Sequence, residues 1–270
     1  MSFKTFFLQK PNDFFKTLLT SVQFELVGKG RAVATVVAPR EDAAIPIVRT
    51  TSVYQNPPQI FAPIHKELAN QISLSLDTVN ESTFNNIMLE RYTLLYRKMG
   101  FHSDHALDLQ DDSYIAIYSC YNSSKSNIKF RKLVIKDKIN EQIYKEILLE
   151  NNMVVAFSTE TNRKYMHKIV IADTNHCITE NDETEWLGLT FRTSKTWLKE
   201  NKINGQDIHL ANFSELQEFR HLKSLENNNV DFYYPHISYT ISSSDLMNPV
   251  CSLVSDNHLD LGLSIQKDIQ

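Results

Sequence analysis

The triplet His102-Ser103-Asp104 places an imidazole and a carboxylate two residues apart. Two histidines and one carboxylate on one face are the ligand set of mononuclear non-haem Fe(II) oxygenases, and they leave three coordination positions open. Residues i and i+2 of a strand share a face, so both side chains can reach one metal ion. The third ligand must then come from a distant antiparallel strand. A hydrogen-bonded turn ahead of a strand has the same pattern, so the triplet alone is a weak signal.

His167 is the candidate third ligand. It lies between two apolar runs in "NMVVAFSTETNRKYMHKIVIAD", 65 residues after His102, and this gap fits several intervening strands. By its local context alone, His167 is more simply explained as a core histidine. His176 in "DTNHCITEND" is a rival, although that segment has the polar composition of a loop. His105 stands beside the triplet and is expected to face solvent.

Two further side chains are placed to bind a small carboxylate. Arg192 lies in the strand-like "LGLTFR", 25 residues after His167. A guanidinium there can hold the distal carboxylate of a 2-oxo acid as a bidentate ion pair. Tyr92, ten residues before His102 in another apolar segment, offers a phenol to the same carboxylate. An ion pair with a surface acid is the alternative interpretation of Arg192.

Helices and strands must position these residues, and short patterns in the sequence predict where those elements lie. Apolar spacing predicts helices at 12–25 and 63–76, and the β-branched run at 32–38 predicts a strand. The further predicted strands are "FNNIMLERYTLL", "SYIAIYSCY", "KFRKLVIKD", "NMVVAFS", "YMHKIVIAD" and "EWLGLTFRTS". Helices are predicted to resume at "SKTWLKEN" and "SELQEFRHLKSLENN". Successive strands after N-terminal helices predict a mainly β protein with flanking helices (α+β), built as a β-sandwich or jelly roll.

Length and composition limit the classes of protein to which the chain can belong. The 270 residues suffice for one large domain or for a domain with an appendage. The expected division is a domain at 1–200 and an appended segment of unknown role at 201–270. Apolar residues make up 42% and charged residues 22%, as in ordinary globular proteins. The 28 basic and 32 acidic residues give a net charge of −4, so the chain as a whole does not attract nucleic acid or anionic membranes.

The cysteines and the N-terminus indicate a compartment. Cys120, Cys177 and Cys251 are far apart and form no CxxC pair, which favours a reducing environment over a disulfide scaffold or zinc ribbon. The N-terminus has too short an apolar run for a signal peptide, and no segment reaches membrane-spanning length. We therefore expect a cytoplasmic protein with no membrane partner.

Four ordered pieces between residues 46 and 198 resemble the AlkB-like dioxygenases that depend on Fe(II) and 2-oxoglutarate. "PIVRTTSVYQNPP" resembles the segment before the family's substrate lid, and "FNNIMLERYTLLYRKMGFHSD" resembles the strand pair that leads into HxD. "RKYMHKI" is similar to the stretch that carries the distal histidine, and "LGLTFRTS" to the closing strand. The resemblance implies a double-stranded β-helix, or jelly roll, of two facing antiparallel sheets that N-terminal helices support.

The resemblance also implies roles for individual residues. Iron would be held by His102, Asp104 and His167, and 2-oxoglutarate by Tyr92 and Arg192. With dioxygen as the other cosubstrate, the implied reaction is the oxidation of a substrate C–H bond. On an N-methyl group this reaction releases formaldehyde and the free amine. The cofactor carries the difficult chemistry, and the protein supplies ligand geometry and substrate orientation.

The substrate is less well determined. Arg49 and Tyr54 stand where the family places its recognition lid, and Tyr54 can either stack on a flipped base or pack in the core. Arg163, four residues before the distal histidine, is either structural or lines the pocket mouth. The basic run at 123–138 can follow a phosphate backbone or keep an exposed strand soluble. Alkylated nucleic acid is the first expected substrate, and a protein or small molecule is the alternative.

Two positions depart from the family pattern. Glu90 stands where the family has an asparagine, and a carboxylate there repels a dicarboxylate unless it is paired or turned away. Trp186 replaces a second arginine, which removes a charge-assisted contact worth about 1.5–3 kcal/mol. These departures leave a third hypothesis open, a degenerate relative kept as a non-catalytic interaction module. We expect Trp186 to fill the arginine's volume by apolar contact. The candidate ion-pair partners for Glu90 are Arg91, Arg97 and Arg163, and the candidate replacements for the arginine are Lys195 and Arg163.

Overall fold

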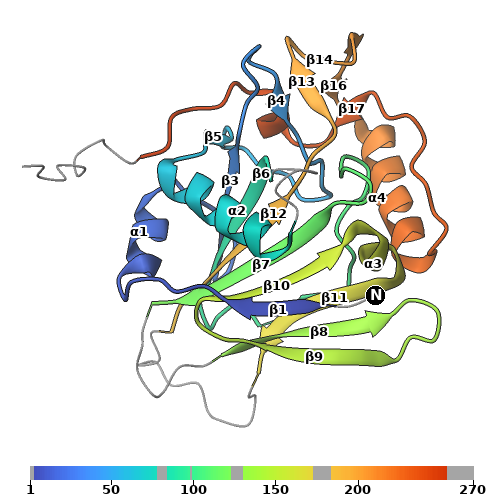
Figure 1. The fold of residues 1–270 in the computed structure, drawn as a ribbon. Helices are drawn as coiled ribbons and strands as arrows, with labels where there is room; N and C mark the ends of the chain where they lie inside the picture. Colours follow the sequence, from blue (N-terminus) through green and yellow to red (C-terminus); the bar gives the residue numbers. More distant parts are fainter. Residues whose placement is uncertain (1–2, 78–83, 98, 123–129, 173–183, 254–270) are drawn as a thin grey trace, which may run out of the picture.

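The structure is a computed structural model that describes residues 3–77, 84–97, 99–122, 130–172 and 184–253. These residues form mostly antiparallel strands with few helices (Figure 1). The strands make one large sheet, one three-stranded sheet and two small sheets. The predicted mainly β fold with flanking helices is therefore confirmed. Within the described residues, no helix is long and apolar enough to span a membrane.

The large sheet carries most of the predicted strands. Its members are β1 (Lys4–Phe7), β2 (Glu25–Gly28), β3 (Arg31–Val37), β5 (Gln59–Ile60), β6 (Asn86–Tyr92), β7 (Tyr114–Tyr121), β10 (Met153–Ser158) and β12 (Trp186–Arg192). Their order is β1-β10-β7-β12-β6-β3-β2, with β5 beside β3. All of these pairs are antiparallel except β3 with β5. Strand β12 is buried along its whole length between β7 and β6.

A second sheet packs against one face of the large sheet. It contains β11 (Tyr165–Ile171), β8 (Arg131–Asp137) and β9 (Ile143–Leu149), in that order. The short helix α3 (Thr159–Lys164) connects β10 to β11. One buried cluster combines side chains of both sheets, among them Ile117 and Trp186 of the large sheet and Leu133 and Ile169 of the second. The space between the two sheets is thus an apolar interior in which a polar site can be enclosed.

Helices α1 (Phe14–Thr20) and α2 (Pro63–Ser75) cover the opposite face of the large sheet. Successive residues of a strand point to opposite faces. Leu89 of β6 therefore packs with Phe14 and Leu68 of the two helices, while its neighbours face the other sheet. Helix α2 begins at Pro63, where a proline costs no helical hydrogen bond. Both predicted N-terminal helices are present, although α1 ends earlier and the chain continues into β2.

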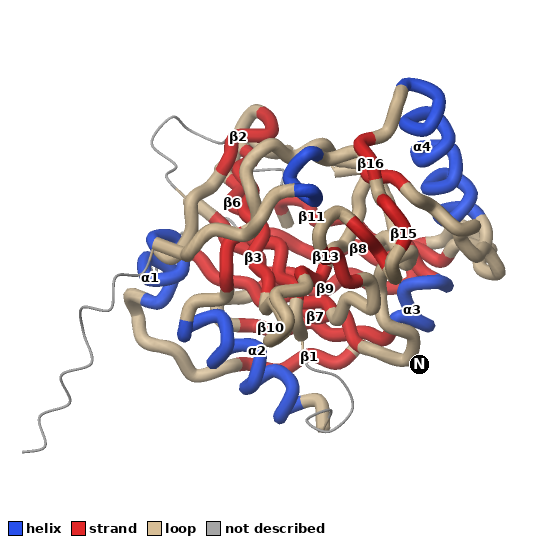
Figure 2. The backbone as a smooth tube through the Cα atoms, turned by 90° about the horizontal axis from the view of Figure 1, so that it is seen from above, coloured by secondary structure: helices blue, strands red, loops and turns tan. Residues whose placement is uncertain are grey.

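Helix α4 (Phe213–Asn228) lies at the end of the sandwich away from α1 (Figure 2), and the chain after it runs back to α1, where the Leu253 N–H donates to the Ser21 carbonyl at 3.2 Å. A small sheet joins β4 (Ile45–Pro46) to β13 (Trp197–Lys199), β14 (Lys202–Ile203) and β15 (Gln206–Asp207). Strands β16 (His209–Leu210) and β17 (Tyr239–Thr240) pair in parallel, and the 3-10 helix η1 spans Ser243–Leu246. The helix predicted at "SKTWLKEN" is wrong. Its central residues pair with β4 and β14, so tertiary pairing overrides the local pattern.

Helix α4 (Phe213–Asn228) confirms the second C-terminal helix prediction. Its start is fixed by a reciprocal cap. The Asn212 side chain accepts from the Glu215 backbone N–H, and the Glu215 carboxylate accepts from the Asn212 backbone N–H. Buried residues of α4 include Phe219, Leu222 and Lys223, so one face of the helix packs inward.

Candidate metal centre

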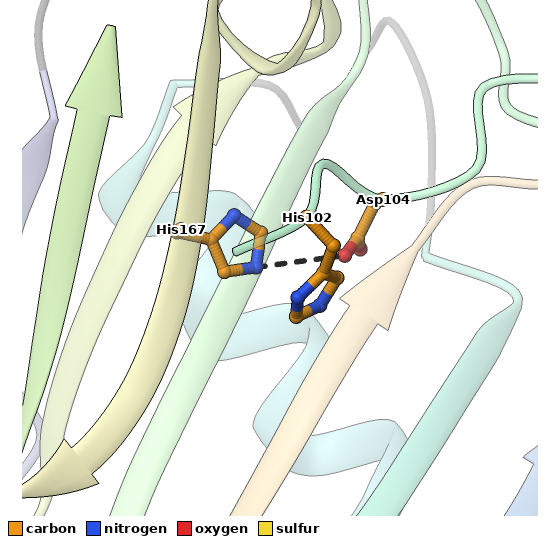
Figure 3. A group of neighbouring side chains, drawn as sticks. All are labelled: His102, Asp104 and His167. Carbon is orange, nitrogen blue, oxygen red and sulfur yellow. Dashed lines mark ion pairs between the residues drawn. The ribbon is translucent and has the colours of Figure 1, made fainter. Parts of the chain in front are cut away.

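His102, Asp104 and His167 lie together at one end of the space between the sheets (Figure 3). One potential ligand atom from each residue lies within 4.8 Å of the others. The carboxylate of Asp104 faces the imidazole of His167, with Nε2 and Oδ1 3.7 Å apart. The structure therefore brings together the three side chains that the sequence singled out.

A two-residue backbone bridge sets the two histidines side by side. The His102 N–H donates to the His167 carbonyl at 3.0 Å, and the His167 N–H donates to the His102 carbonyl at 2.7 Å. The expectation that His102 and Asp104 share a strand is wrong, since Asp104 lies outside any strand. Asn162 of α3 holds it instead. The Asp104 N–H donates to Asn162 Oδ1, and Asn162 Nδ2 donates to the Asp104 carbonyl, both at 2.9 Å.

The charges around the three side chains suit metal ligation. Burial alone would raise the pKa of Asp104. The opposing effect of Arg192 and the nearby imidazoles is larger, so the pKa of this carboxyl lies well below its ordinary range. Burial lowers the pKa of His167 to about 3, with help from its cationic neighbours. Burial also lowers the pKa of His102. At neutral pH the site thus offers one carboxylate and two neutral imidazoles, the forms that bind metal ions.

His102 presents a defined ring nitrogen. Its Nδ1 lies 3.0 Å from the Gly100 carbonyl oxygen. A carbonyl can only accept, so the proton of this hydrogen bond sits on Nδ1 and Nε2 remains available as a ligand atom.

A cavity of about 280 Å³ extends from the ligand group along β6 and β12. Arg192 lines the end beside Asp104, with Nε donating to Oδ2 at 2.7 Å. Glu90, Arg31 and Tyr96 line the other end. The register places Glu90 four positions from the level of Arg192, roughly 13 Å along the strands. The cavity is therefore elongated and carries charged groups at both ends.

Tyr92 and Arg192 do not converge on one carboxylate, contrary to the prediction. In the β6–β12 ladder, Tyr92 lies opposite Trp186 and Arg192 lies opposite Asn86. Six residue positions separate the two levels, roughly 20 Å at the rise of a strand. Tyr92 is fully buried behind the cavity wall, with its ring 4.4 Å from that of Tyr96. The two residues can only act at opposite ends of a ligand.

Glu90 forms the predicted ion pair, but with an unexpected residue. Arg31 of the neighbouring strand β3 donates to Glu90 Oε1 from Nε at 3.0 Å and from Nη2 at 2.7 Å. Arg31 lies diagonally across from Glu90 in the β3–β6 ladder, a position from which long side chains meet. The three arginines that we expected make other contacts. Arg91 pairs with Glu185, Arg97 donates to the Leu94 carbonyl, and Arg163 lies near Asp111.

Trp186 fills space by apolar contact, as expected. It is 2% exposed, and its ring lies 4.9 Å from that of Tyr92. Its indole N–H donates to Ser119 Oγ at 2.8 Å. The ring lies across Gly188, where an added Cβ would come within 2.0 Å of it. Lys195 does not replace the missing arginine, because it pairs with the exposed Asp111.

The three candidate substrate residues have different environments. Arg49 is buried, pairs with Asp108 at 2.7 Å and donates to two backbone carbonyls, so its role is structural and it does not line the cavity. Tyr54 does line the cavity, but it is 8% exposed and packs against Met88. Arg163 lies over the Tyr233 ring, 4.5 Å from its centroid, away from the cavity lining. Buried positions of Arg49 and Tyr54 argue against an open recognition lid at these residues.

Helix α4 contributes two cavity residues that the sequence did not reveal. Lys223 donates to the Ser103 carbonyl and pairs with Glu226 at 2.6 Å. Asn227 Oδ1 accepts from the backbone N–H and the hydroxyl of Ser103, both at 3.1 Å. The segment after residue 200 thus holds the loop that carries His102 and Asp104. Polar side chains four apart on the buried face of an amphipathic helix were the available signal.

His105 is also buried rather than solvent-facing, contrary to our expectation. Its ring stacks on Phe219 of α4 at 5.6 Å, and Nδ1 lies 3.3 Å from the Tyr234 hydroxyl. Burial and nearby cations bring its pKa well below the ordinary value. His176, the rival ligand, and the first part of the basic run at 123–129 lie outside the described residues.

Comparisons with known proteins add a distant structural likeness. No family model matches the chain, and no curated protein matches it. Among solved structures, that of OsALKBH1 is similar over 67% of this chain and 91% of its own, with 14% identity and a TM-score of 0.42.

Proposed function

We propose that this chain is a jelly-roll dioxygenase of the AlkB-like type that uses Fe(II) and 2-oxoglutarate. The observation that carries the proposal is the meeting of His102, Asp104 and His167 at the end of a cavity of about 280 Å³. Two neutral imidazoles and one carboxylate are the donor set that non-haem Fe(II) oxygenases use, with open positions for cosubstrates. The two facing sheets, with mostly antiparallel strands, are compatible with a jelly roll.

The residues beside the ligand group also fit an anionic cosubstrate. Arg192 is 7% exposed and donates from Nε to Asp104, while its Nη1 is buried without a hydrogen-bond partner among the described residues. A buried unpaired donor costs free energy unless a ligand satisfies it. A 2-oxo acid bound at the metal would bring a carboxylate to this atom.

Each residue then has a role that its geometry supports. The two imidazoles and the carboxylate hold the metal, and Arg192 keeps Asp104 ionised and orients it. Arg192 Nη1 binds the cosubstrate carboxylate next to the metal. Fe(II) and 2-oxoglutarate, when bound, would supply with dioxygen the oxidation of a substrate C–H bond. Lys223 and Asn227 hold the loop that carries the candidate ligands against the cavity.

A basic depression beside the cavity supports nucleic acid as the substrate. This open hollow of about 580 Å³ shares Lys223 and Asn227 with the metal cavity and is also lined by Lys136, Arg220 and Phe101. Basic side chains with a partly exposed aromatic ring suit phosphates and stacked bases. We therefore favour an alkylated nucleic acid, whose modified base would enter the cavity, over a protein or small molecule.

Succinate formation tests the proposal. The purified protein is incubated with Fe(II), ascorbate, 2-oxoglutarate and a methylated single-stranded oligonucleotide, and both succinate and formaldehyde are measured. His102→Ala should abolish both products, while the exposed His209→Ala serves as the matched control. Succinate without formaldehyde would redirect the search to another substrate. A wild-type protein that binds no divalent ion and forms no succinate would support the non-catalytic alternative.

A further inference from the structure

A buried carboxylate on α4, that of Glu226, is the common acceptor for three donors. Glu226 is 6% exposed and lies on the inward face of the helix. Its Oε1 accepts from the backbone N–H of Ala106 at 2.8 Å. Its Oε2 accepts from Lys223 Nζ at 2.6 Å and from the Tyr234 hydroxyl at 2.9 Å. Because all three partners donate, the side chain serves purely as an acceptor, which a carboxylate can do at both oxygens.

Two of these donors connect Glu226 to further residues of the loop at 103–106. Lys223 Nζ also donates to the Ser103 carbonyl at 2.5 Å. The Tyr234 hydroxyl lies 3.3 Å from His105 Nδ1. Since the hydroxyl gives its single proton to Glu226, Nδ1 is the donor of this second bond. Together with the direct contact described above, three of the four loop residues are thus held by one carboxylate.

The backbone of Glu226 is in turn attached to the second sheet. Lys138, which directly follows β8, donates from Nζ to the Glu226 carbonyl at 2.7 Å. A cation at the last turn of a helix satisfies a carbonyl that has no helical partner. Strand β8 pairs with β11, which carries His167. Glu226 therefore connects the loop that carries two of the candidate ligands to the sheet that carries the third.

Stability alone does not explain a buried ion pair on this face of α4. Lys223 and Glu226 are both buried, and burial lowers the pKa of Lys223. Desolvation offsets much of the attraction within such a pair, and apolar residues of similar volume are often equally stabilising. Apolar side chains at these positions could fill the space, but they could hold neither the Ser103 carbonyl nor the Ala106 N–H. The pair therefore indicates a role that depends on the conformation of the loop.

We propose that Glu226 is a positioning residue for the metal centre, which holds the loop at 103–106 so that its two ligands and His167 can bind one ion. This inference rests on the metal centre of the proposed function. Metal ligands must be held within about 0.5 Å of the productive geometry, and neighbouring residues supply that restraint. Glu226 acts on the ligands through the donors that it binds. Helix α4, which the sequence placed in an appended segment, is then part of the metal centre.

Glu226→Gln tests the assignment, because an amide accepts only at its oxygen. With that oxygen toward the Ala106 N–H, its NH2 group would face the donors of Lys223 and Tyr234. Mn(II) affinity, measured by calorimetry on the folded variant, should fall at least about tenfold, as for other partners behind metal ligands. Urea unfolding without metal measures the structural cost separately, and a merely structural role would lower that value alone. Glu218→Gln, at an exposed position of the same helix, is the matched control and should keep the wild-type Mn(II) affinity.

A second variant covers a failure of Glu226→Gln to fold. Tyr234→Phe keeps the ring and deletes the hydroxyl between His105 and Glu226, so the fold should survive, and Mn(II) affinity should fall about threefold. Tyr239→Phe, which deletes a hydroxyl that donates to Glu218, is its control. If the wild type binds Mn(II) and the Glu226 and Tyr234 variants that fold bind it equally well, the role of Glu226 is overturned while the proposed function stands. If the wild type binds no Mn(II), both proposals fail.

Discussion

Arg192 donates from Nε to Oδ2 of Asp104 at 2.7 Å, and both side chains are buried. The ion pair keeps the carboxylate ionised and leaves Oδ1 facing His167. It also holds the guanidinium at the end of the cavity where a cosubstrate carboxylate would meet the metal. Substitutions at these two residues therefore test metal binding and cosubstrate binding at the same end of the cavity.

Asp104→Asn should remove metal binding and destabilise the fold. The amide is a poorer ligand, and the guanidinium of Arg192 loses its buried counter-charge. We expect Mn(II) affinity to fall by at least about a hundredfold, since even partners behind the ligands contribute about 10–100-fold. The free energy of unfolding should fall by about 3–5 kcal/mol. Calorimetry and urea unfolding measure these effects, with the exposed Asp111→Asn as the control. Wild-type Mn(II) affinity in Asp104→Asn would exclude the carboxylate as a ligand.

Arg192→Met should weaken the binding of 2-oxoglutarate and of 2-oxopentanoate, which lacks the distal carboxylate, to the same extent. This residue acts at the end of the ligand that 2-oxoglutarate and 2-oxopentanoate share. Loss of a charge-assisted contact of about 1.5–3 kcal/mol corresponds to an affinity loss of about tenfold or more. Competition binding on the Mn(II)-loaded protein shows whether the two losses match. A loss confined to 2-oxoglutarate would place Arg192 at the distal carboxylate instead.

Glu90→Asn should maintain or improve 2-oxoglutarate affinity. The substitution removes a carboxylate from the remote end of the cavity and frees Arg31 for the ligand. Metal binding should be unchanged, because Glu90 is not in the ligand group. Glu185→Gln, which leaves Arg91 unpaired on the same strand, is the control. If Glu90→Asn folds and binds Mn(II) but loses 2-oxoglutarate, Glu90 has a positive role in ligand binding.

Gly188→Ala should destabilise the protein through Trp186. The added Cβ would lie 2.0 Å from the indole, so the ring must leave its place against Tyr92. Overpacking of this kind costs about 1–3 kcal/mol. Urea unfolding measures the cost, and Gly100→Ala, whose Cβ would meet nothing within 4 Å, is the control. Combining Gly188→Ala with Trp186→Leu should cost less than the sum of the two single changes. Strict additivity would mean that the indole does not occupy this space.

Local patterns were enough to predict several of the elements and the ligand group. Apolar spacing located α2, a β-branched run located β3, and a short apolar segment located β12. The HxD spacing and the apolar flanks of His167 identified side chains that meet in the structure. These predictions are correct because short-range periodicity indicates which face of an element is buried.

Cross-strand partners could not be predicted, because they depend on register. The pairing of Glu90 with Arg31 joins residues 59 positions apart, and nothing in the chain indicates that β3 lies beside β6. The burial of Arg131 has the same origin, since its basic surroundings in the sequence indicated an exposed strand. Lys223 reaches the site only because α4 folds back on the triplet loop.

His65 should make stability depend on pH in a defined window. It is 0% exposed, and burial lowers its pKa to about 4. Its Nδ1 accepts from the Ala62 N–H at 3.0 Å, so protonation destroys this helix-start hydrogen bond. The unfolded chain, with a pKa near 6.5, binds more protons between about pH 4 and 6.5. The contribution of neutral His65 is therefore complete above about pH 6.5 and is lost as the pH falls toward 4.

Urea unfolding at pH 7 and pH 5 measures this contribution. Wild-type stability should fall between the two, and His65 should account for up to about 2 kcal/mol of the loss. In His65→Gln the new side chain can still accept a hydrogen bond from the Ala62 N–H, but it does not titrate. The free energy of unfolding of this variant should therefore fall less than that of the wild type between pH 7 and pH 5. His209→Gln, at an exposed position, should keep the wild-type slope. An identical slope in His65→Gln and wild type would show that His65 is not held neutral in the folded protein.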